Sequence, residues 1–495
     1  MGDSSFLIKR HWEIVSAVPL LLLFAAVVAF VQYTASVLAL PGEWNGFEGI
    51  MLFAADRLFS GEPLYSSPSD YPFVIFIYPP LYPLLLKPFL WLFGPSLLPA
   101  RLISVFSVGL VAGCLWHGTR KQTSSPWIPW AVLGLFFGDK ALAQWYAIGR
   151  VDPLAAGLSV FAVYWVAVRG ARGKALALGL GCAFLAAGVK QTGILAVLAI
   201  LCAVWRERPR KALRPTALTL LALAGIWMLL AVFTRGGWLV HTGWGAQACA
   251  DRTWGWNLVV PYLKLNAVLL AGAAVATLWR WKEGRANALD IFYALLWVFT
   301  IFGIARKGSS YYYFIPVSAI ACFLFGYLLL RLREISLKTQ QALPLLTGIL
   351  LLAFQGAAYA KGAYPMPTRE DVRIYRAMSE HIAQVEGPVL MDTWYTALLR
   401  AQRPILFEPN TYYVLEKAGA FQEEPRRVML EKLLADIEAR RFKEIVAHFV
   451  LYLPEVQEAI DRNYEVRALI PMRDISLTYF FHIYVPRELQ REELL

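Results

Sequence analysis

The chain has little charge and few cysteines for its length. Charged residues make up 17% of its 495 residues, whereas about 25% is usual in soluble globular proteins. Apolar residues reach 58% and the mean hydropathy is +0.50. The five cysteines include no Cys-x-x-Cys pair. The composition therefore excludes an ordinary soluble protein and argues against a disulfide framework or a structural zinc site.

Acidic residues are scarce in one part of the chain only. Residues 1–360 hold 14 acidic and 29 basic residues, a net charge of +15. Residues 361–495 hold 21 acidic and 18 basic residues, a net charge of −3 at the density of a soluble protein. We therefore predict a membrane domain over 1–360 and a soluble domain over 361–495, and we expect no nucleic-acid partner.

About eleven segments are apolar enough to cross a membrane, since some 20 residues span roughly 30 Å of hydrocarbon. The predicted spans are 14–37, 96–117, 126–147, 153–168, 175–189, 191–205, 214–234, 259–279, 288–305, 311–330 and 342–360. Lys and Arg gather in alternate connecting segments, and such loops mark the cytoplasmic side. The pattern predicts a multi-pass protein with a cytoplasmic N-terminus and an extracytoplasmic C-terminal domain.

The first outward loop, residues 38–95, is long and aromatic. Residues 47–59 have apolar side chains at helical spacing, which predicts a helix lying flat on the outer surface. Residues 78–93 are expected to form a second helix in the outer interface that does not cross the membrane.

Ionisable groups at membrane depth are functional candidates. A carboxylate can take a proton from an incoming hydroxyl, and Lys and Arg can hold a phosphate leaving group. Aromatic side chains suit sugar faces and isoprenoid tails. The candidates at the outer ends of the predicted spans are Glu48, Arg150, Asp152, Lys190, Gln191, His241 and Lys307, with Tyr78 and Tyr82 beside them. Together they predict glycosyl transfer from a lipid-phosphate sugar.

Each candidate also has a structural explanation. Glu48 can stabilise a helix N-terminus, and Asp152 can cap the helix that follows it. Arg150 and Lys190 can extend to the membrane interface. A single His241 in an aromatic loop is often structural, and the tyrosines can form an interfacial belt.

The order of several motifs resembles the GT-C superfamily of polytopic glycosyltransferases, which includes protein O-mannosyltransferases and the lipid A aminoarabinose transferase. The motifs cover most of residues 40–330. They are Glu48-Gly49, Ala54-Ala-Asp-Arg-Leu58, Gly61-Glu-Pro-Leu-Tyr65, Tyr78-Pro-Pro-Leu-Tyr-Pro83, Arg101, Gly149-Arg-Val-Asp-Pro153, Val189-Lys-Gln-Thr192 and Lys307-Gly-Ser-Ser-Tyr-Tyr-Tyr313.

The resemblance implies a catalytic acidic residue in the first outward loop, here Glu48, and a second one at Asp152. It also implies a polyprenyl-phosphate-sugar donor and inversion at the anomeric carbon. Phe47 stands where the family commonly has Asp. Some relatives use a divalent cation and others do not. We expect a hexosyl- or pentosyltransferase whose acceptor is a hydroxyl group of a glycan, a lipid or a protein. The transferase itself is expected to contact membrane lipid. In this hypothesis Arg150, Lys190 and Lys307 bind the lipid phosphate, and Gln191, Tyr78, Tyr82 and His241 complete the substrate site.

Two other functions are compatible with a chain that has many membrane spans and buried charged residues. A lipid or sugar transporter or flippase with an accessory outer domain is one, although we find no repeat between the two halves of the chain, as transporters commonly have. A scaffold that presents residues 361–495 is the other. That domain alternates strands and helices, which predicts a small α/β layer with a mainly parallel sheet. Its expected strands are 387–391, 404–408, 444–449, 464–470 and 478–485.

Overall fold

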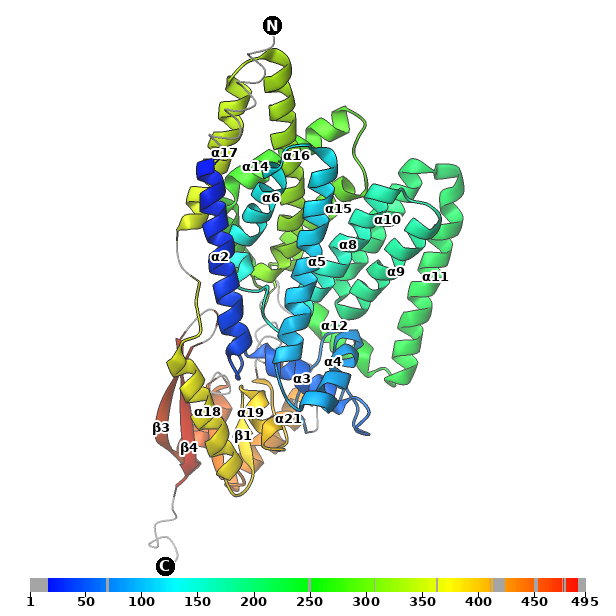
Figure 1. Cartoon of the computed structure of the whole chain (residues 1–495). Coiled ribbons are helices and arrows are strands. Elements are labelled where there is room, and N and C mark those ends of the chain that lie inside the picture. The colour runs from blue at the N-terminus through cyan, green and yellow to red at the C-terminus, as the bar shows by residue number, and fades with distance from the viewer. Residues whose placement is uncertain are drawn as a thin grey trace, which may run out of the picture.

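The computed structural model describes residues 17–67, 71–247, 251–306, 308–361, 364–409, 411–412, 423–448, 453–473, 475 and 478–487. A bundle of long helices carries an α/β domain at one end (Figure 1). The predicted architecture, a mainly helical membrane domain with a small C-terminal α/β domain, is confirmed.

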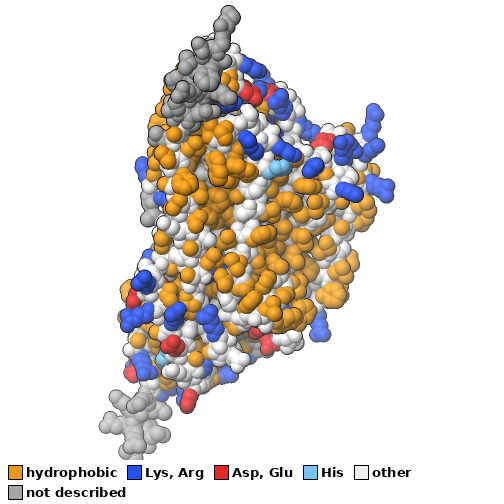
Figure 2. Space-filling view, viewed as in Figure 1, with side chains coloured by type: hydrophobic (Ala, Val, Ile, Leu, Met, Phe, Trp, Pro, Cys, Tyr) orange, Lys and Arg blue, Asp and Glu red, His pale blue; other side chains and the backbone are white. Residues whose placement is uncertain are grey.

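The helical part is built from apolar segments separated by short polar turns. Its helices are α2 (Ala17–Ala39), α3 (Phe47–Arg57), α4 (Leu81–Phe93), α5 (Leu98–Gln122), α6 (Trp127–Gly138), α7 (Lys140–Ala143), α8 (Val151–Arg169), α9 (Gly173–Val189), η1 (Gln191–Gly193), α10 (Ile194–Glu207), α11 (Pro209–Phe233), α12 (Gly237–Gln247), α13 (Arg252–Leu265), α14 (Ala267–Lys282), α15 (Ala288–Gly303), η2 (Tyr311–Phe314), α16 (Ile315–Thr339) and α17 (Leu343–Ala360). Apolar side chains cover the middle of the bundle, and Lys and Arg gather at the end away from the α/β domain (Figure 2).

By the length and composition of the helices, the structure has fewer full membrane spans than the sequence predicted. Within the described residues, five helices are long and apolar enough to cross a membrane, or six if the bent pair α13–α14 is one span. Each of the eleven predicted segments contains a helix, but several of these helices are shorter than a full span. The count of eleven therefore stays a prediction.

The predicted span 259–279 is not one straight helix. Helices α13 and α14 meet at an angle of 80°. Asn266 between them leaves the helical conformation and is buried. Its amide nitrogen donates to Asp139 Oδ2 at 2.9 Å, and its Oδ1 accepts from the Tyr359 hydroxyl at 2.5 Å. These side-chain bonds satisfy polar groups at the break and hold the two helices at that angle.

The helix predicted over 47–59 forms as α3, and its position on the outer surface of the membrane stays a prediction. Most of its residues are buried, because α4 packs against it on one side and α19 of the α/β domain packs against it on another. The predicted interfacial helix 78–93 forms as α4, which Pro79 and Pro80 precede. Both helices lie at the end of the bundle that carries the α/β domain (Figure 1).

The α/β domain has a mixed sheet of order β1-β2-β4-β3. Its elements are α18 (Arg369–Gln384), β1 (Val389–Met391), α19 (Tyr395–Arg400), α21 (Glu423–Glu438), β2 (Glu444–Ala447), α22 (Pro454–Asn463), β3 (Tyr464–Arg473) and β4 (Thr478–Pro486). Strands β1 and β2 are parallel, whereas β4 is antiparallel to both β2 and β3. The expected mainly parallel sheet is therefore wrong, because β3 and β4 form an antiparallel pair. The expected strand 404–408 is reduced to one bridge, between Phe407 and Phe73.

The first loop of the helical part is fastened to the α/β domain at several points. The Phe73 amide donates to Leu406 O at 2.8 Å, and the Glu408 amide donates back to Phe73 O at 3.0 Å. The Ile475 amide donates to Trp44 O at 3.0 Å. The buried Glu43 carboxylate accepts from the backbone amide of Thr396 at 2.9 Å. These bonds fix the α/β domain over one end of the bundle.

Candidate functional site

Two cavities meet at the start of α8. The interdomain cavity, about 570 Å³, lies between the helical part and the α/β domain, and its volume is in the usual range for small-molecule sites. The helical cavity is narrow, about 40 Å³, and lies among α8, α10, α15 and α16. Arg150 lines the first, Asp152 lines the second, and Tyr312 lines both.

A single carboxylate holds two cations at this junction. Lys190 Nζ lies 2.5 Å from Asp152 Oδ1, and Arg150 Nε lies 3.1 Å from Asp152 Oδ2. All three side chains are almost fully buried. Asp152 stands in the first turn of α8, where the helix dipole favours a negative charge. The group as a whole carries one net positive charge, which is suited to binding an anion.

Further contacts fix Arg150 in the wall of the interdomain cavity. Its Nη1 donates to Asn45 Oδ1 at 3.0 Å and its Nη2 donates to the Tyr78 hydroxyl at 3.4 Å. The guanidinium carbon lies 4.9 Å from the ring centre of Phe47 and 4.6 Å from that of Tyr312. Such cation–π contacts add to the stabilisation of a desolvated guanidinium.

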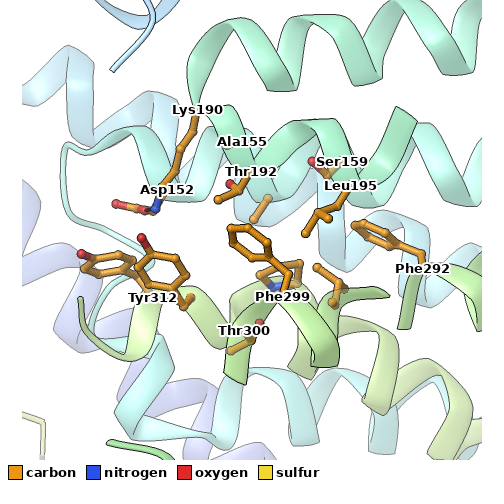
Figure 3. A pocket seen from close by; sticks show the side chains of 14 residues that line it. Asp152, Ala155, Ser159, Lys190, Thr192, Leu195, Phe292, Phe299, Thr300 and Tyr312 are labelled. Carbon is orange, nitrogen blue, oxygen red and sulfur yellow. Dashed lines mark hydrogen bonds and ion pairs between the residues drawn. The ribbon is translucent and has the colours of Figure 1, made fainter. Parts of the chain in front are cut away.

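Lys190 and Gln191 come from the turn between α9 and α10. Lys190 Nζ lies 4.1 Å from the ring centre of Tyr313 and 4.8 Å from that of Tyr312. Gln191 donates to the backbone oxygen of Ile77 at 2.6 Å, which ties this turn to the segment before α4. Asp152 and Lys190 point toward each other at one end of the helical cavity, and Phe292 lies at the other end (Figure 3). The cavity therefore runs from a charged end to an apolar one.

Glu48 lies close to this junction but lines neither cavity. Its carboxylate accepts from Arg101 Nε at 2.9 Å and Nη2 at 2.8 Å, from the Trp44 amide at 2.7 Å and from the Gly149 amide at 2.8 Å. Burial raises the pKa of Glu48, but the charge of Arg101 and these hydrogen bonds outweigh it, so the pKa lies below its usual value. Glu48 stays ionised and joins α3, α5 and the turn before Arg150.

Of the remaining predicted site residues that the structure describes, only Tyr78 joins the group. The Tyr82 hydroxyl is buried and donates to Ala100 O at 3.4 Å. His241 on α12 accepts from the Phe76 amide at its Nδ1, 3.1 Å away, and its Nε2 lies 2.8 Å from Ser66 O. Burial lowers the pKa of His241, which favours the neutral ring. Lys307 lies outside the described residues.

Several residues of the site were not predicted. Asn45 and Trp145 contact Arg150, and Asp392 and Glu408 of the α/β domain line the interdomain cavity. Asp392 directly follows a segment that the sequence predicts as a strand, and residues after parallel strands often face a ligand. That signal was available, but nothing local in the sequence connects residue 392 to residue 150.

The described side chains do not fit a divalent cation at the junction. Among the residues that the structure describes, no three His, Cys, Asp or Glu side chains come close enough together to share one. Asp152 has each of its oxygens against a cationic nitrogen, which would compete with a metal ion for the same lone pairs.

The fold is similar to that of solved ArnT structures. ArnT from Cupriavidus metallidurans superposes with a TM-score of 0.54 in its apo state and 0.55 in its complex with undecaprenyl phosphate, at 14% and 13% identity. Both comparisons cover 94% of this chain and 97% of ArnT. An oligosaccharyltransferase from Archaeoglobus fulgidus matches at a TM-score of 0.42 and 12% identity, over 94% of this chain and 72% of that one.

No family model and no curated protein sequence matches the chain. The likeness is therefore one of fold, and it rests on the two ArnT structures. The chain has a GT-C-like fold, as the order of its sequence motifs predicted.

Proposed function

We propose that this chain, which folds as ArnT does, is an integral membrane glycosyltransferase that takes a sugar from a polyprenyl-phosphate donor. ArnT has been crystallised with undecaprenyl phosphate. In the present chain, the observation that carries the proposal is the junction of the two cavities. A cationic group stands between a roomy cavity, whose wall mixes polar and aromatic side chains, and a narrow one that ends among apolar side chains. An amphiphilic donor has the same three parts: a sugar, a phosphate and a hydrocarbon tail.

In this proposal, Lys190 and Arg150 bind the phosphate of the donor. Asp152 orients both cations and lowers the cost of burying them. When the bond between the anomeric carbon and the phosphate oxygen breaks, negative charge grows on the phosphate, and two preorganised cations stabilise it. The isoprenoid tail of the bound donor extends from the phosphate toward the apolar side chains of Leu195, Phe292 and Phe299.

The acceptor hydroxyl attacks the anomeric carbon from the side opposite the phosphate while the bond from that carbon to the phosphate oxygen breaks, so the configuration inverts. The proton of the hydroxyl goes to the released phosphate, which has gained negative charge. We place this reaction on the extracytoplasmic face, with the α/β domain on that side. The clustering of Lys and Arg at the other end of the bundle supports this orientation through the positive-inside trend (Figure 2).

We assign Glu48 a positioning role, because both of its oxygens already accept hydrogen bonds from Arg101 and the backbone. It holds the Gly149 amide, one residue before Arg150, and so sets where that cation stands. Asp152, with its two cations, likewise positions groups for the phosphate.

The test is sugar transfer by the purified chain in proteoliposomes from a panel of polyprenyl-phosphate sugars. Lys190→Met keeps the aliphatic stem and removes the charge, so we expect turnover to fall about 10²- to 10³-fold, as for the loss of one preorganised donor. Lys174→Met is the matched control, because Lys174 is exposed at the opposite end of the bundle. If Lys190→Met turns over at the wild-type rate, the proposed binding of the donor phosphate by Lys190 is wrong. Movement of donor across the membrane without a covalent product would instead favour a transporter.

A further inference from the structure

The α/β domain contributes two buried carboxylates to the interdomain cavity. Asp392 has 3% and Glu408 has 4% of its surface exposed, and both line the cavity. Neither takes part in the phosphate site proposed above. Carboxylates accept hydrogen bonds, so a ligand that contacts Asp392 and Glu408 must donate them, as hydroxyl groups do.

The sheet fixes the position of Asp392. Strands β1 and β2 are parallel neighbours, so their carboxyl ends meet at one edge, where ligands commonly bind in such sheets. Asp392 follows β1 directly, and its Oδ2 accepts from the His448 amide, just after β2, at 2.8 Å. Its backbone oxygen accepts from the Tyr395 hydroxyl at 2.8 Å. The side chain is therefore held against the cavity by both strands.

Glu408 is placed by the segment that crosses to the first loop. Its amide donates to Phe73 O at 3.0 Å, and its carboxylate accepts from the Thr411 amide at 3.1 Å. The two carboxylates thus reach one cavity from two separate segments of the α/β domain.

The opposite wall comes from the helical part and has a different chemistry. It presents the Arg150 guanidinium and the Asn45 amide, together with the aromatic rings of Phe47 and Trp145. A ligand between the two walls meets hydrogen-bond acceptors on one side, donors on the other and apolar rings beside it. The hydroxyls of a sugar ring both donate and accept hydrogen bonds, and its C–H faces can pack against the aromatic rings. A second anionic group would be repelled by Asp392 and Glu408.

We propose that Asp392 and Glu408 bind the hydroxyl groups of an uncharged sugar in the interdomain cavity. This proposal rests on the proposed function, since it places the sugar next to the phosphate held by Arg150 and Lys190. The sugar belongs to the donor or to a glycan acceptor, and both offer the same hydroxyl chemistry. The α/β domain is then a part of the substrate site and determines which sugars enter.

The experiment measures steady-state transfer by Asp392→Asn and Glu408→Gln with the donor that the wild type uses. The asparagine keeps an oxygen for the His448 amide, which protects the fold. The donor concentration is varied at saturating acceptor, and then the acceptor at saturating donor. We expect kcat/KM to fall about 10- to 100-fold, the effect of losing a hydrogen bond to a charged group. The fall appears for the donor if its sugar occupies the cavity, and for the acceptor if the glycan does.

Glu370→Gln on the exposed face of α18 is the control and should keep wild-type kinetics. Wild-type kcat/KM in both cavity variants, for both substrates, would overturn the proposal. If the wild type transfers no sugar, the proposed function fails, and binding of uncharged methyl glycosides measured by saturation-transfer NMR decides the inference separately. Binding that is lost in Asp392→Asn or Glu408→Gln would support it, and no binding by the wild type would overturn it.

Discussion

The Glu48 carboxylate and the Arg101 guanidinium form a bidentate ion pair with no exposed surface. A buried pair of this kind is costly to break, because removing one partner leaves the other charge without compensation. The sequence placed Glu48 in the expected motif, but it could not show that Arg101, 53 residues away, occupies its oxygens. The role of an acidic residue follows from its neighbours as much as from its motif.

We expect Glu48→Gln to destabilise the folded protein by about 3–5 kcal/mol, since Arg101 loses its buried counter-charge. Unfolding of purified protein in detergent, followed by intrinsic fluorescence, measures this. Glu370→Gln is the control, because Glu370 is 63% exposed and its partner Arg373 is 81% exposed, so their contact is worth less than about 1 kcal/mol. A Glu48→Gln protein that unfolds like the wild type but transfers sugar 10²-fold more slowly would instead point to proton transfer by Glu48.

At the scale of single elements, Gly49 shows why α3 tolerates little change on the side that faces the α/β domain. A Cβ atom on Gly49 would stand 2.3 Å from Glu43 Oε1 and 2.9 Å from Tyr395 Cβ. These atoms belong to the first loop and to α19, so the helix fits between them only without a side chain at this position.

We predict that Gly49→Ala destabilises the contact between α3 and α19 by about 1–3 kcal/mol, the usual cost of overpacking. Limited proteolysis of the α/β domain should then proceed faster than in the wild type. Gly113→Ala on α5 serves as the control, because the space around Gly113 is open. Equal proteolysis rates for Gly49→Ala and the wild type would contradict the predicted clash.

The break between α13 and α14 is a second feature at this scale. Asn266→Leu would leave Asp139 Oδ2 and the Tyr359 hydroxyl without their described bonds to Asn266. Each buried polar group that loses its partner costs about 1–3 kcal/mol. The polar break lay inside an apolar run, and this explains why the hydropathy pattern predicted a continuous helix there.

Sequence reasoning located whole elements better than it located the site. Apolar runs predicted the helices of the bundle because hydrophobicity is a local property. The motif at 149–153 and the turn at 189–192 meet at Asp152, as their predicted position on the same side of the membrane suggested. Asp392 and Glu408 were missed as site residues, because their approach to Arg150 depends on how a distant domain docks, and no local spacing encodes that docking.

At the scale of the whole molecule, Glu43 joins the helical part to the α/β domain through Thr396. Burial raises the pKa of Glu43 to about 8. The folded protein therefore keeps the proton up to about pH 8, whereas the unfolded chain releases it above its ordinary pKa of 4.5. Unfolding releases a proton in this window, so the stability that the neutral carboxyl contributes falls as the pH rises from about 4.5 to 8.

We expect Glu43→Gln, which is neutral at every pH, to gain stability relative to the wild type as the pH rises through that window and to keep the gain above pH 8. Unfolding temperatures of both proteins between pH 5 and pH 9 measure the difference. Glu380→Gln on α18 serves as the control for an exposed carboxylate. A difference between Glu43→Gln and the wild type that does not change with pH would contradict a raised pKa.

The interdomain cavity also has a consequence for biosynthesis. One wall is complete once residue 312 has been made, but the other wall waits for Asp392, Glu408 and Phe481. Domains fold in the order of their synthesis, so we expect the helical part to form while the interdomain cavity is still open on one side. The cavity closes only when the last strand joins the sheet. A chain that stops before β4 is therefore expected to lack one wall of the interdomain cavity.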